Sequence, residues 1–384
     1  MKKSLLILWV VLLNFHTFLC NAQKEYIEVN STILKETRQL KIQLPRNYDP
    51  NTEKTYPLIF VFDGDYLFEP VAGIVDYLSY WEEIPEAFVV GIKQDGQRIE
   101  DGNYDKNNFV PQGTGADFFD FIQIEVLRYL RENYKLNEFS VAVGHNYMAN
   151  FMNLFLFSDQ NPFQGFINLS PDIPDGLVPY IKKELDVVNQ KIWYSVSIGS
   201  NDLDFLEKKA KTINKTFSTI YNEDVSFSYK QFKDTNHYSL VTYAIPFSLT
   251  EIFEIYGPIT NEEYESKLSK AKNPVDYLED KYKSIYDLYG VNKTIRIKDI
   301  MLVAQLIEEN KTPERYKDLS KLVKESYPKT MLSDYFLGKY YQEIGKPKKA
   351  IKAYQNAYAY DEAGGITKDM VIEEADKLKE IFGY

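Results

Sequence analysis

Short and almost continuous apolar runs recur along the chain up to residue 232, separated by segments with helical periodicity. The runs cover residues 58–62, 88–92, 139–143, 166–169, 192–198 and 225–232. Strands of this kind are buried on both faces, as in a largely parallel sheet covered by helices. Residues 116–132 have the clearest helical pattern, because their apolar positions form a single stripe. The alternation predicts a doubly wound α/β layer with its ligand site at the carboxyl ends of the strands.

The patterns before and after this region differ from it. Residues 24–44 alternate between apolar and polar positions, which predicts an opening pair of strands. Strand signals stop after residue 232, and beyond the turn-forming pair Gly257-Pro258 the chain is helical and rich in Lys, Glu and Tyr. We therefore expect an α/β domain over residues 23–258 and an all-α domain over residues 259–384.

The helical domain has a spacing of small and aromatic residues typical of a tetratricopeptide repeat. The matching positions are Leu337, Gly338, Tyr341, Gly345, Ala350, Tyr354 and Ala357. Small residues at fixed positions let the two antiparallel helices of such a repeat pack closely. One good copy and one degraded copy upstream are too few for a long solenoid. The domain is therefore either a cap that stabilises the α/β domain or a groove for a protein partner.

Residues 1–22 follow the pattern of a secretory signal peptide. Lys2 and Lys3 precede an apolar run over residues 5–13, and Ala22 supplies a small residue at a cleavage site. The apolar run is too short to span a bilayer, and we expect no membrane span. The mature chain is expected to be secreted or periplasmic.

Cys20, the single cysteine of the chain, could instead carry a lipid anchor. That alternative is disfavoured because Leu19 is bulkier than the small residue that such a signal needs before its cysteine. If Cys20 leaves with the signal, the mature chain has neither disulfide nor thiol chemistry. The whole chain carries a formal net charge of −11, and cleavage removes two lysines and no acid. Nucleic acids and anionic membrane surfaces are therefore not expected partners.

A sharp strand-to-helix turn is predicted at Gly144-His145-Asn146-Tyr147-Met148. It follows the pattern of the G-x-S-x-G nucleophile elbow, in which glycines let the backbone pass closely and a serine hydroxyl stands at the top of the sheet. Asn146 holds the serine position and Met148 the second glycine position. An amide has no hydroxyl to deprotonate, so the usual covalent route of acyl transfer is unavailable at Asn146. We also expect Met148 to prevent the following helix from packing closely on the strand.

The segment from Arg38 to His237 resembles the esterase branch of the α/β-hydrolase superfamily, which includes esterase D and the enterobactin-type siderophore esterases. The matching pieces are, in order, RQLKIQLPRNYDP (38–50), YPLIFVFDGDYLF (56–68), IPEAFVVGI (84–92), GADFFDFIQIEVLRYLRENY (115–134), FSVAVGHNYMANFMNLF (139–155), FQGFINLSPDI (163–173) and DTNHYSL (234–240). The resemblance implies an α/β-hydrolase fold and a pocket for a small-molecule ester or a siderophore-like ligand.

The resemblance also implies a general base and its partner. His237 follows the last predicted strand, where this family presents its catalytic imidazole, and residues 236–239 resemble the family's His-Gly-Ser-Val segment. A triad needs a carboxylate to orient the imidazole. Asp202, after the strand at 192–198, is our choice, with Asp204 as the reserve.

The oxyanion hole expected from the family would use main-chain donors. The nearest matches are the backbone N–H groups of Asp65 and Tyr147. Ser170 ends a neighbouring strand, where the family also has a serine, so we interpret it as structural. His145 is expected to pack beside the turn rather than to act as a base.

The motif search favours neither metal nor nucleotide chemistry, because the HExxH, paired CxxC and P-loop spacings do not occur. We therefore predict no cofactor and no metal. Three hypotheses remain. The leading one is a catalytically degenerate relative that keeps the pocket for binding. The second is an active carboxylic-ester hydrolase in which His237 activates water, and the third is a protein-interaction module built on the tetratricopeptide-like domain.

Overall fold

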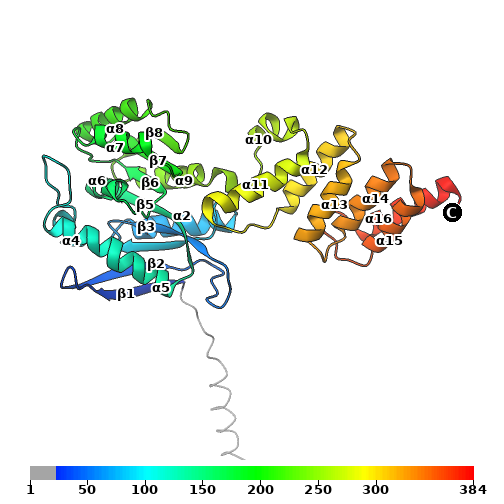
Figure 1. Cartoon of the computed structure of the whole chain (residues 1–384), viewed down its shortest axis with the longest axis horizontal. Coiled ribbons are helices and arrows are strands. Elements are labelled where there is room, and N and C mark those ends of the chain that lie inside the picture. The colour runs from blue at the N-terminus through cyan, green and yellow to red at the C-terminus, as the bar shows by residue number, and fades with distance from the viewer. Residues whose placement is uncertain (1–22) are drawn as a thin grey trace, which may run out of the picture.

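The structure is a computed structural model that describes residues 23–384. The expected signal peptide and Cys20 lie outside the described residues. An eight-stranded sheet forms the centre of the first part of the chain, with strand order β1-β2-β4-β3-β5-β6-β7-β8 (Figure 1). The strands are β1 (Lys24–Asn30), β2 (Thr37–Gln43), β3 (Tyr56–Val61), β4 (Phe88–Ile92), β5 (Leu136–His145), β6 (Gly165–Leu169), β7 (Ile192–Asn201) and β8 (Val225–Asn236).

The direction of pairing confirms the predicted fold class. The β1-β2 and β2-β4 pairs are antiparallel, and every later neighbour pair from β4-β3 to β7-β8 is parallel. All residues of β3, β4 and β6 are buried, whereas the edge strand β1 alternates between exposed and half-buried positions. The apolar runs that form β3, β4 and β6 are thus strands buried on both faces, and the alternating run is an edge strand. The expectation was wrong for the run at 225–232, which forms β8 at the opposite edge of the sheet and is largely half-buried or exposed.

Helices cover both faces of the sheet. They are α2 (Phe68–Tyr80), α3 (Arg98–Asp101), α4 (Thr114–Asp120), α5 (Leu127–Asn133), α6 (Tyr147–Met152), α7 (Val178–Val187), α8 (Asp204–Phe217) and α9 (Leu240–Ile252), with a π-helical turn η1 (Phe121–Val126) and a 3-10 turn η2 (Asn153–Phe157). One apolar core includes α2 and α9, and a second core on the other face includes α4 to α8. The predicted helix at 116–132 is the continuous run of α4, η1 and α5.

The rest of the chain is helical and extends away from the sheet, as the yellow to red ribbon of Figure 1 shows. It contains η3 (Glu254–Tyr256), α10 (Asn261–Ser266), η4 (Leu268–Lys270), α11 (Pro274–Tyr289), α12 (Ile297–Glu309), α13 (Arg315–Ser326), α14 (Leu332–Glu343), α15 (Pro347–Ala357) and α16 (Lys368–Phe382). Gly338 packs so closely on Tyr354 that a Cβ at Gly338 would lie 2.4 Å from the ring. This contact explains why α14 has a small residue at position 338, where it packs on α15. The tetratricopeptide assignment stays a prediction.

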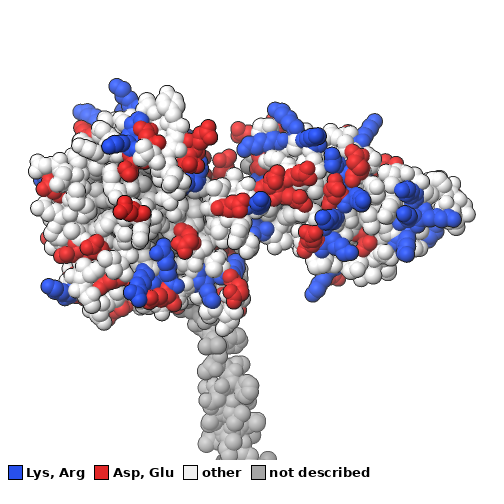
Figure 2. All heavy atoms as spheres, viewed as in Figure 1, with Lys and Arg blue, Asp and Glu red and all other residues white. Residues whose placement is uncertain are grey.

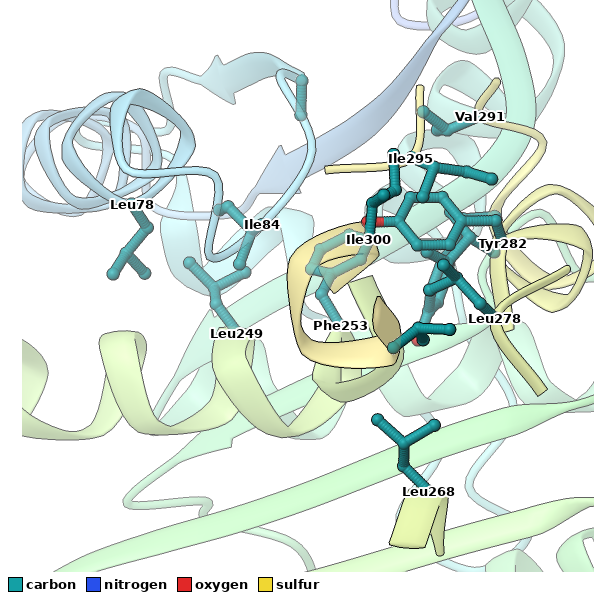
Figure 3. Close-up of a cluster of buried hydrophobic side chains, with 14 of the residues drawn as sticks. Leu78, Ile84, Leu249, Phe253, Leu268, Leu278, Tyr282, Val291, Ile295 and Ile300 are labelled. Carbon is teal, nitrogen blue, oxygen red and sulfur yellow. The ribbon is translucent and has the colours of Figure 1, made fainter. Parts of the chain in front are cut away.

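A single apolar core joins the sheet to the helical part. Figure 3 shows Leu249 and Phe253, from the end of α9, in one cluster with Leu278, Tyr282 and Ile300 of α11 and α12. The Tyr289 hydroxyl donates to the Ile252 carbonyl at 2.7 Å. Packing and hydrogen bonds therefore cross residue 258, and α11 is seated on the α/β layer.

Candidate functional site

The backbone at Asn146 has the geometry of a nucleophile elbow. Asn146 lies between β5 and α6 with φ 55° and ψ −113°, and its N–H donates to the Leu169 carbonyl at 2.9 Å. A residue with a side chain in such a sparsely populated region costs about 1–3 kcal/mol unless the surrounding structure enforces it. The amide side chain of Asn146 thus stands at the carboxyl edge of the sheet, where the family places its serine.

The glycine before the turn is required by close packing. A Cβ on Gly144 would lie 2.9 Å from the Ala149 Cα and from the Met148 carbonyl oxygen. The helix after the turn therefore packs tightly on the strand, and the expectation that Met148 would prevent this was wrong. The Met148 side chain is fully buried in the apolar core and points to Gln94, so it does not occupy the space between helix and strand.

His237 and Asp202 meet as an imidazole–carboxylate pair. The Nδ1 atom of His237 lies 2.9 Å from Oδ1 of Asp202, whose side chain is 0 % exposed. The Leu203 N–H donates to the same oxygen at 2.7 Å, and the Ser170 hydroxyl donates to Oδ2. Burial alone would raise the pKa of Asp202, but the hydrogen bonds from His237, Ser170 and Leu203 outweigh it and hold the pKa below its usual value. The reserve candidate Asp204 is exposed at the start of α8.

His145 packs directly beside His237. The two ring centroids lie 4.3 Å apart, and the Nδ1 atom of His145 is 3.0 Å from the Tyr66 hydroxyl. His145 is 2 % exposed, and burial, followed by the neighbouring His237 and Arg98, lowers its pKa to about 3. His145 is therefore neutral near pH 7 and forms a wall of the site, as the sequence led us to expect.

The structure places His237 over the elbow but records no hydrogen bond between His237 and the Asn146 amide within residues 23–384. Asn146 is half-buried, and its side chain has no hydrogen-bond partner in this part of the chain. The amide is thus open to a ligand instead of being held by the imidazole.

The two expected main-chain donors are also open. The N–H groups of Asp65 and Tyr147 have no acceptor in the described part of the chain. The side chains of these residues are occupied elsewhere, since Asp65 accepts from the Gln94 N–H at 2.7 Å and Tyr147 donates to the Gly102 carbonyl at 2.8 Å. Open N–H groups beside the elbow are what an oxyanion or a carboxylate oxygen would need.

Sequence reasoning missed a charged pair behind the elbow. The Arg98 guanidinium donates to both oxygens of Asp63, at 2.6 and 2.9 Å, and to the His145 carbonyl at 3.0 Å. Burial is the largest influence on the Asp63 carboxyl and raises its pKa, which the ion pair with Arg98 only partly offsets. These residues are far apart in the chain and belong to no motif, so only the folded backbone reveals the pair.

An apolar cavity of about 490 Å³ lies near the elbow helix. Its walls come from the loop before α4, from α4, from η2 and from α7, and include Phe109, Phe119, Phe157 and Tyr180. Such an apolar cavity can accept an apolar group of a ligand. Its lining residues do not include those of the elbow turn, to which α6 and η2 connect it along the chain.

The described residues contain neither a cluster of metal-ligating side chains nor a helix suited to span a membrane. Within residues 23–384, no three His, Cys, Asp or Glu side chains are grouped so that they could hold a metal ion. None of the helices in this range has the length and apolar character that crossing a bilayer requires.

Residues 31–158 match the model of the family described as Putative esterase. The matched residues run from before β2 to the end of η2 and include the elbow. The structure is also similar to that of an uncharacterised protein from Capnocytophaga ochracea, which is 26% identical over 93% of this chain and 100% of that one, with a TM-score of 0.82. An IroE-like serine hydrolase from Shewanella oneidensis is 18% identical over 79% of this chain and 99% of that one, with a TM-score of 0.59. No curated protein matches the chain.

Proposed function

We propose that this chain is an exported esterase-like α/β-hydrolase that has lost its nucleophile and uses the remaining pocket to bind a small ester or siderophore-like ligand. The observation that carries the proposal is Asn146 in the strained elbow position. The backbone that would aim a serine is intact, while the side chain has no hydroxyl to attack a carbonyl carbon.

The parts that bind rather than react support the same proposal. The N–H groups of Asp65 and Tyr147 are open to an oxygen atom, the Asn146 amide adds a donor and an acceptor, and the apolar cavity near α6 can take a hydrocarbon or aromatic group. A carbonyl or carboxylate oxygen at the elbow with an apolar substituent in the cavity fits this arrangement. The siderophore-like class comes from the family resemblance and the IroE-like relative, and names the first ligands to try.

The decisive experiment compares purified protein of residues 23–384 with its Asn146→Ser and Asn146→Ala variants on p-nitrophenyl acetate and butyrate. We expect wild type and Asn146→Ala to stay at background and to remain unlabelled by a fluorophosphonate probe, while Asn146→Ser is labelled at residue 146. Binding of p-nitrophenyl butyrate to the wild type, without turnover, is read by ligand-observed NMR. Stoichiometric labelling of a serine in the wild type would refute the loss of the nucleophile.

The second candidate function is ester hydrolysis by water that His237 activates. The buried Asp202–His237 hydrogen bond favours it, because this pair is what a general base requires. A triad enzyme stripped of catalytic residues retains roughly 10³–10⁴-fold acceleration over water, so only a turnover number in the usual range of about 1–10³ s⁻¹ would establish this function. Asp202→Asn should then abolish turnover, whereas the matched variant Asp204→Asn should not.

A third candidate makes the helical part a site for a protein partner. On the face shown in Figure 2, acidic and basic side chains both lie over the helices near the junction with the sheet, and basic side chains predominate toward the far end of the helices. A local surface charge can orient a partner of the opposite charge. A truncation at residue 296 that keeps ligand binding but loses a partner would separate this role from the pocket.

A further inference from the structure

The largest described cavity lies away from the elbow, between the sheet and the helical part. It has a volume of about 1060 Å³. One wall is formed around Tyr56, at the start of β3, and around Tyr80 and Trp81, at the end of α2; the other is the loop over residues 291–298 with Tyr327. Since β3 runs parallel to β5, this inter-part cleft lies at the amino edge of the sheet, opposite the elbow.

Lys293 reaches across this cleft from the loop between α11 and α12. Its Nζ atom donates to the Tyr256 carbonyl and lies 3.6 Å from the centroid of the Tyr256 ring. No carboxylate forms a salt bridge with Lys293 within residues 23–384, and the nearby Glu82 is already paired with Arg296 at 2.7 Å. The amine therefore stands in a cavity, beside another cation, without a counter-ion.

This environment disfavours the ammonium form. Burial, followed by the neighbouring Arg296, lowers the pKa of Lys293 to about 7. The Tyr256 carbonyl and ring stabilise the ammonium form, so part of the Lys293 population is protonated near neutral pH. In the rest of the population the lone pair of the amine is available. Desolvation and a neighbouring cation are the two devices that turn lysine into a nucleophile in proteins.

We propose that Lys293 is a nucleophilic amine that captures aldehydes as Schiff bases in the inter-part cleft. The Nζ lone pair adds to the carbonyl carbon, the carbonyl oxygen takes a proton from the nitrogen, and loss of water from this carbinolamine gives the C=N bond. The step consumes only amine and aldehyde and releases water, so it needs neither oxidant nor reductant. It is independent of the function proposed for the elbow.

The walls of the cleft indicate which aldehydes fit. Tyr80 and Trp81 are 58% and 60% exposed and meet edge to face at 5.1 Å, which offers an aromatic surface. The lining carries no excess of positive charge, because Arg46, Lys54 and Arg296 are paired with Asp76, Glu86 and Glu82, and the remaining Lys298 is balanced by Glu83. The walls therefore favour an aromatic aldehyde without selecting its charge.

The test uses pyridoxal 5′-phosphate as the aromatic aldehyde, because its phosphate ester prevents the aldehyde from closing to a hemiacetal. Wild-type protein is incubated with it at pH 7, reduced with borohydride and mapped by peptide mass spectrometry. An ordinary lysine with a pKa near 10.4 is only about 0.04 % neutral at pH 7, so Lys293 should be labelled at least about tenfold more than Lys298, which lines the same cleft and is exposed. Lysines labelled in proportion to exposure, with no enrichment at Lys293, would overturn the proposal.

Two further measurements keep the result interpretable. Lys293→Arg should abolish the enriched label while Lys298→Arg preserves it, with circular dichroism showing that both variants fold. The rate of imine formation at Lys293 should level off near pH 7, where Arg296, Lys281, Glu82 and Asp299 are the charges that face the amine. A rate that keeps rising toward pH 10 contradicts a nucleophilic Lys293.

Discussion

His145 makes the stability of this protein depend on pH in a range where most side chains do not titrate. We consider acidification of the folded protein from pH 7.5 to pH 5.0. In the folded protein burial lowers the pKa of His145 to about 3, against the ordinary value of 6.5 that the unfolded chain recovers. Between these values the unfolded state binds the proton and the folded state does not, so the free energy of unfolding falls as pH falls.

The size of the effect follows from the two pKa values. At pH 7.5 neither state is protonated, and the contribution is close to zero. At pH 5.0 the pH is about 1.5 units below the pKa of the unfolded imidazole, which is therefore protonated, while the folded imidazole is still neutral. This difference lowers the free energy of unfolding by about 2 kcal/mol at 1.36 kcal/mol per unit. The loss approaches its full value, about 5 kcal/mol, only near pH 3. Solvent screens the electrostatic effect on His145 very little, because its side chain is 2 % exposed.

The assay is urea unfolding of wild type and His145→Asn at both pH values. Asparagine can still form a hydrogen bond with the Tyr66 hydroxyl but does not titrate, so the other groups cancel in the difference between the two proteins. We expect wild type to lose about 2 kcal/mol more than the variant on acidification. NMR of the imidazoles gives a direct check, because residues 23–384 contain only the histidines His145 and His237. A His145 signal that titrates near pH 6, or parallel losses in both proteins, would refute the reasoning.

Three other predictions concern the elbow and the junction. Asn146→Ser should raise kcat/KM on p-nitrophenyl butyrate at least about 100-fold over Asn146→Ala, and adding Met148→Gly should change it little because the elbow is already formed; a large further gain would show that Met148 does distort the turn. Gly144→Ala should lower the free energy of unfolding measured in urea by about 2–4 kcal/mol. The control Gly73→Ala should raise it by about 0.5–1 kcal/mol, because Gly73 lies in a helix and the added Cβ has no atom within 4 Å. Equal effects of the two substitutions would contradict the close approach of helix and strand at Gly144. A fragment ending at Pro258 should aggregate or melt lower than residues 23–384, because it uncovers the core beneath α11, and a fragment with unchanged melting by circular dichroism would show that this core is not shared.

The strands and the elbow could be predicted because they depend on local patterns. The runs at 58–62 and 88–92 read as buried strands, and the turn at Gly144 was readable because glycine and its spacing are backbone requirements. The residues proposed as acid and base were found in the same way, from their position after strands, and Asp202 and His237 lie 2.9 Å apart.

What the sequence could not supply depends on contacts between distant segments. Arg98 reaches Asp63 and the His145 carbonyl only after the three strands β4, β3 and β5 have aligned, and nothing in its sequence neighbourhood marks Arg98 as part of a site. The expected obstruction by Met148 was wrong because a flexible side chain can turn into the core, which a motif comparison does not represent. The boundary at Pro258 stays a prediction that rests on a local turn signal. The apolar core shared across it depends on α11 folding back onto the sheet, which the local pattern does not show.

The strained backbone at Asn146 lowers the stability of the fold, and a single substitution would relieve part of that strain. Glycine tolerates positive φ far better than asparagine, so Asn146→Gly would release part of the roughly 1–3 kcal/mol stored there, and mutational drift tends to remove idle strain. The backbone at Asn146 nevertheless has the shape of a nucleophile elbow, with an amide where a hydroxyl would stand. Under the proposed function this turn is a short route to catalysis, because one side-chain replacement places a hydroxyl on a turn that is already formed.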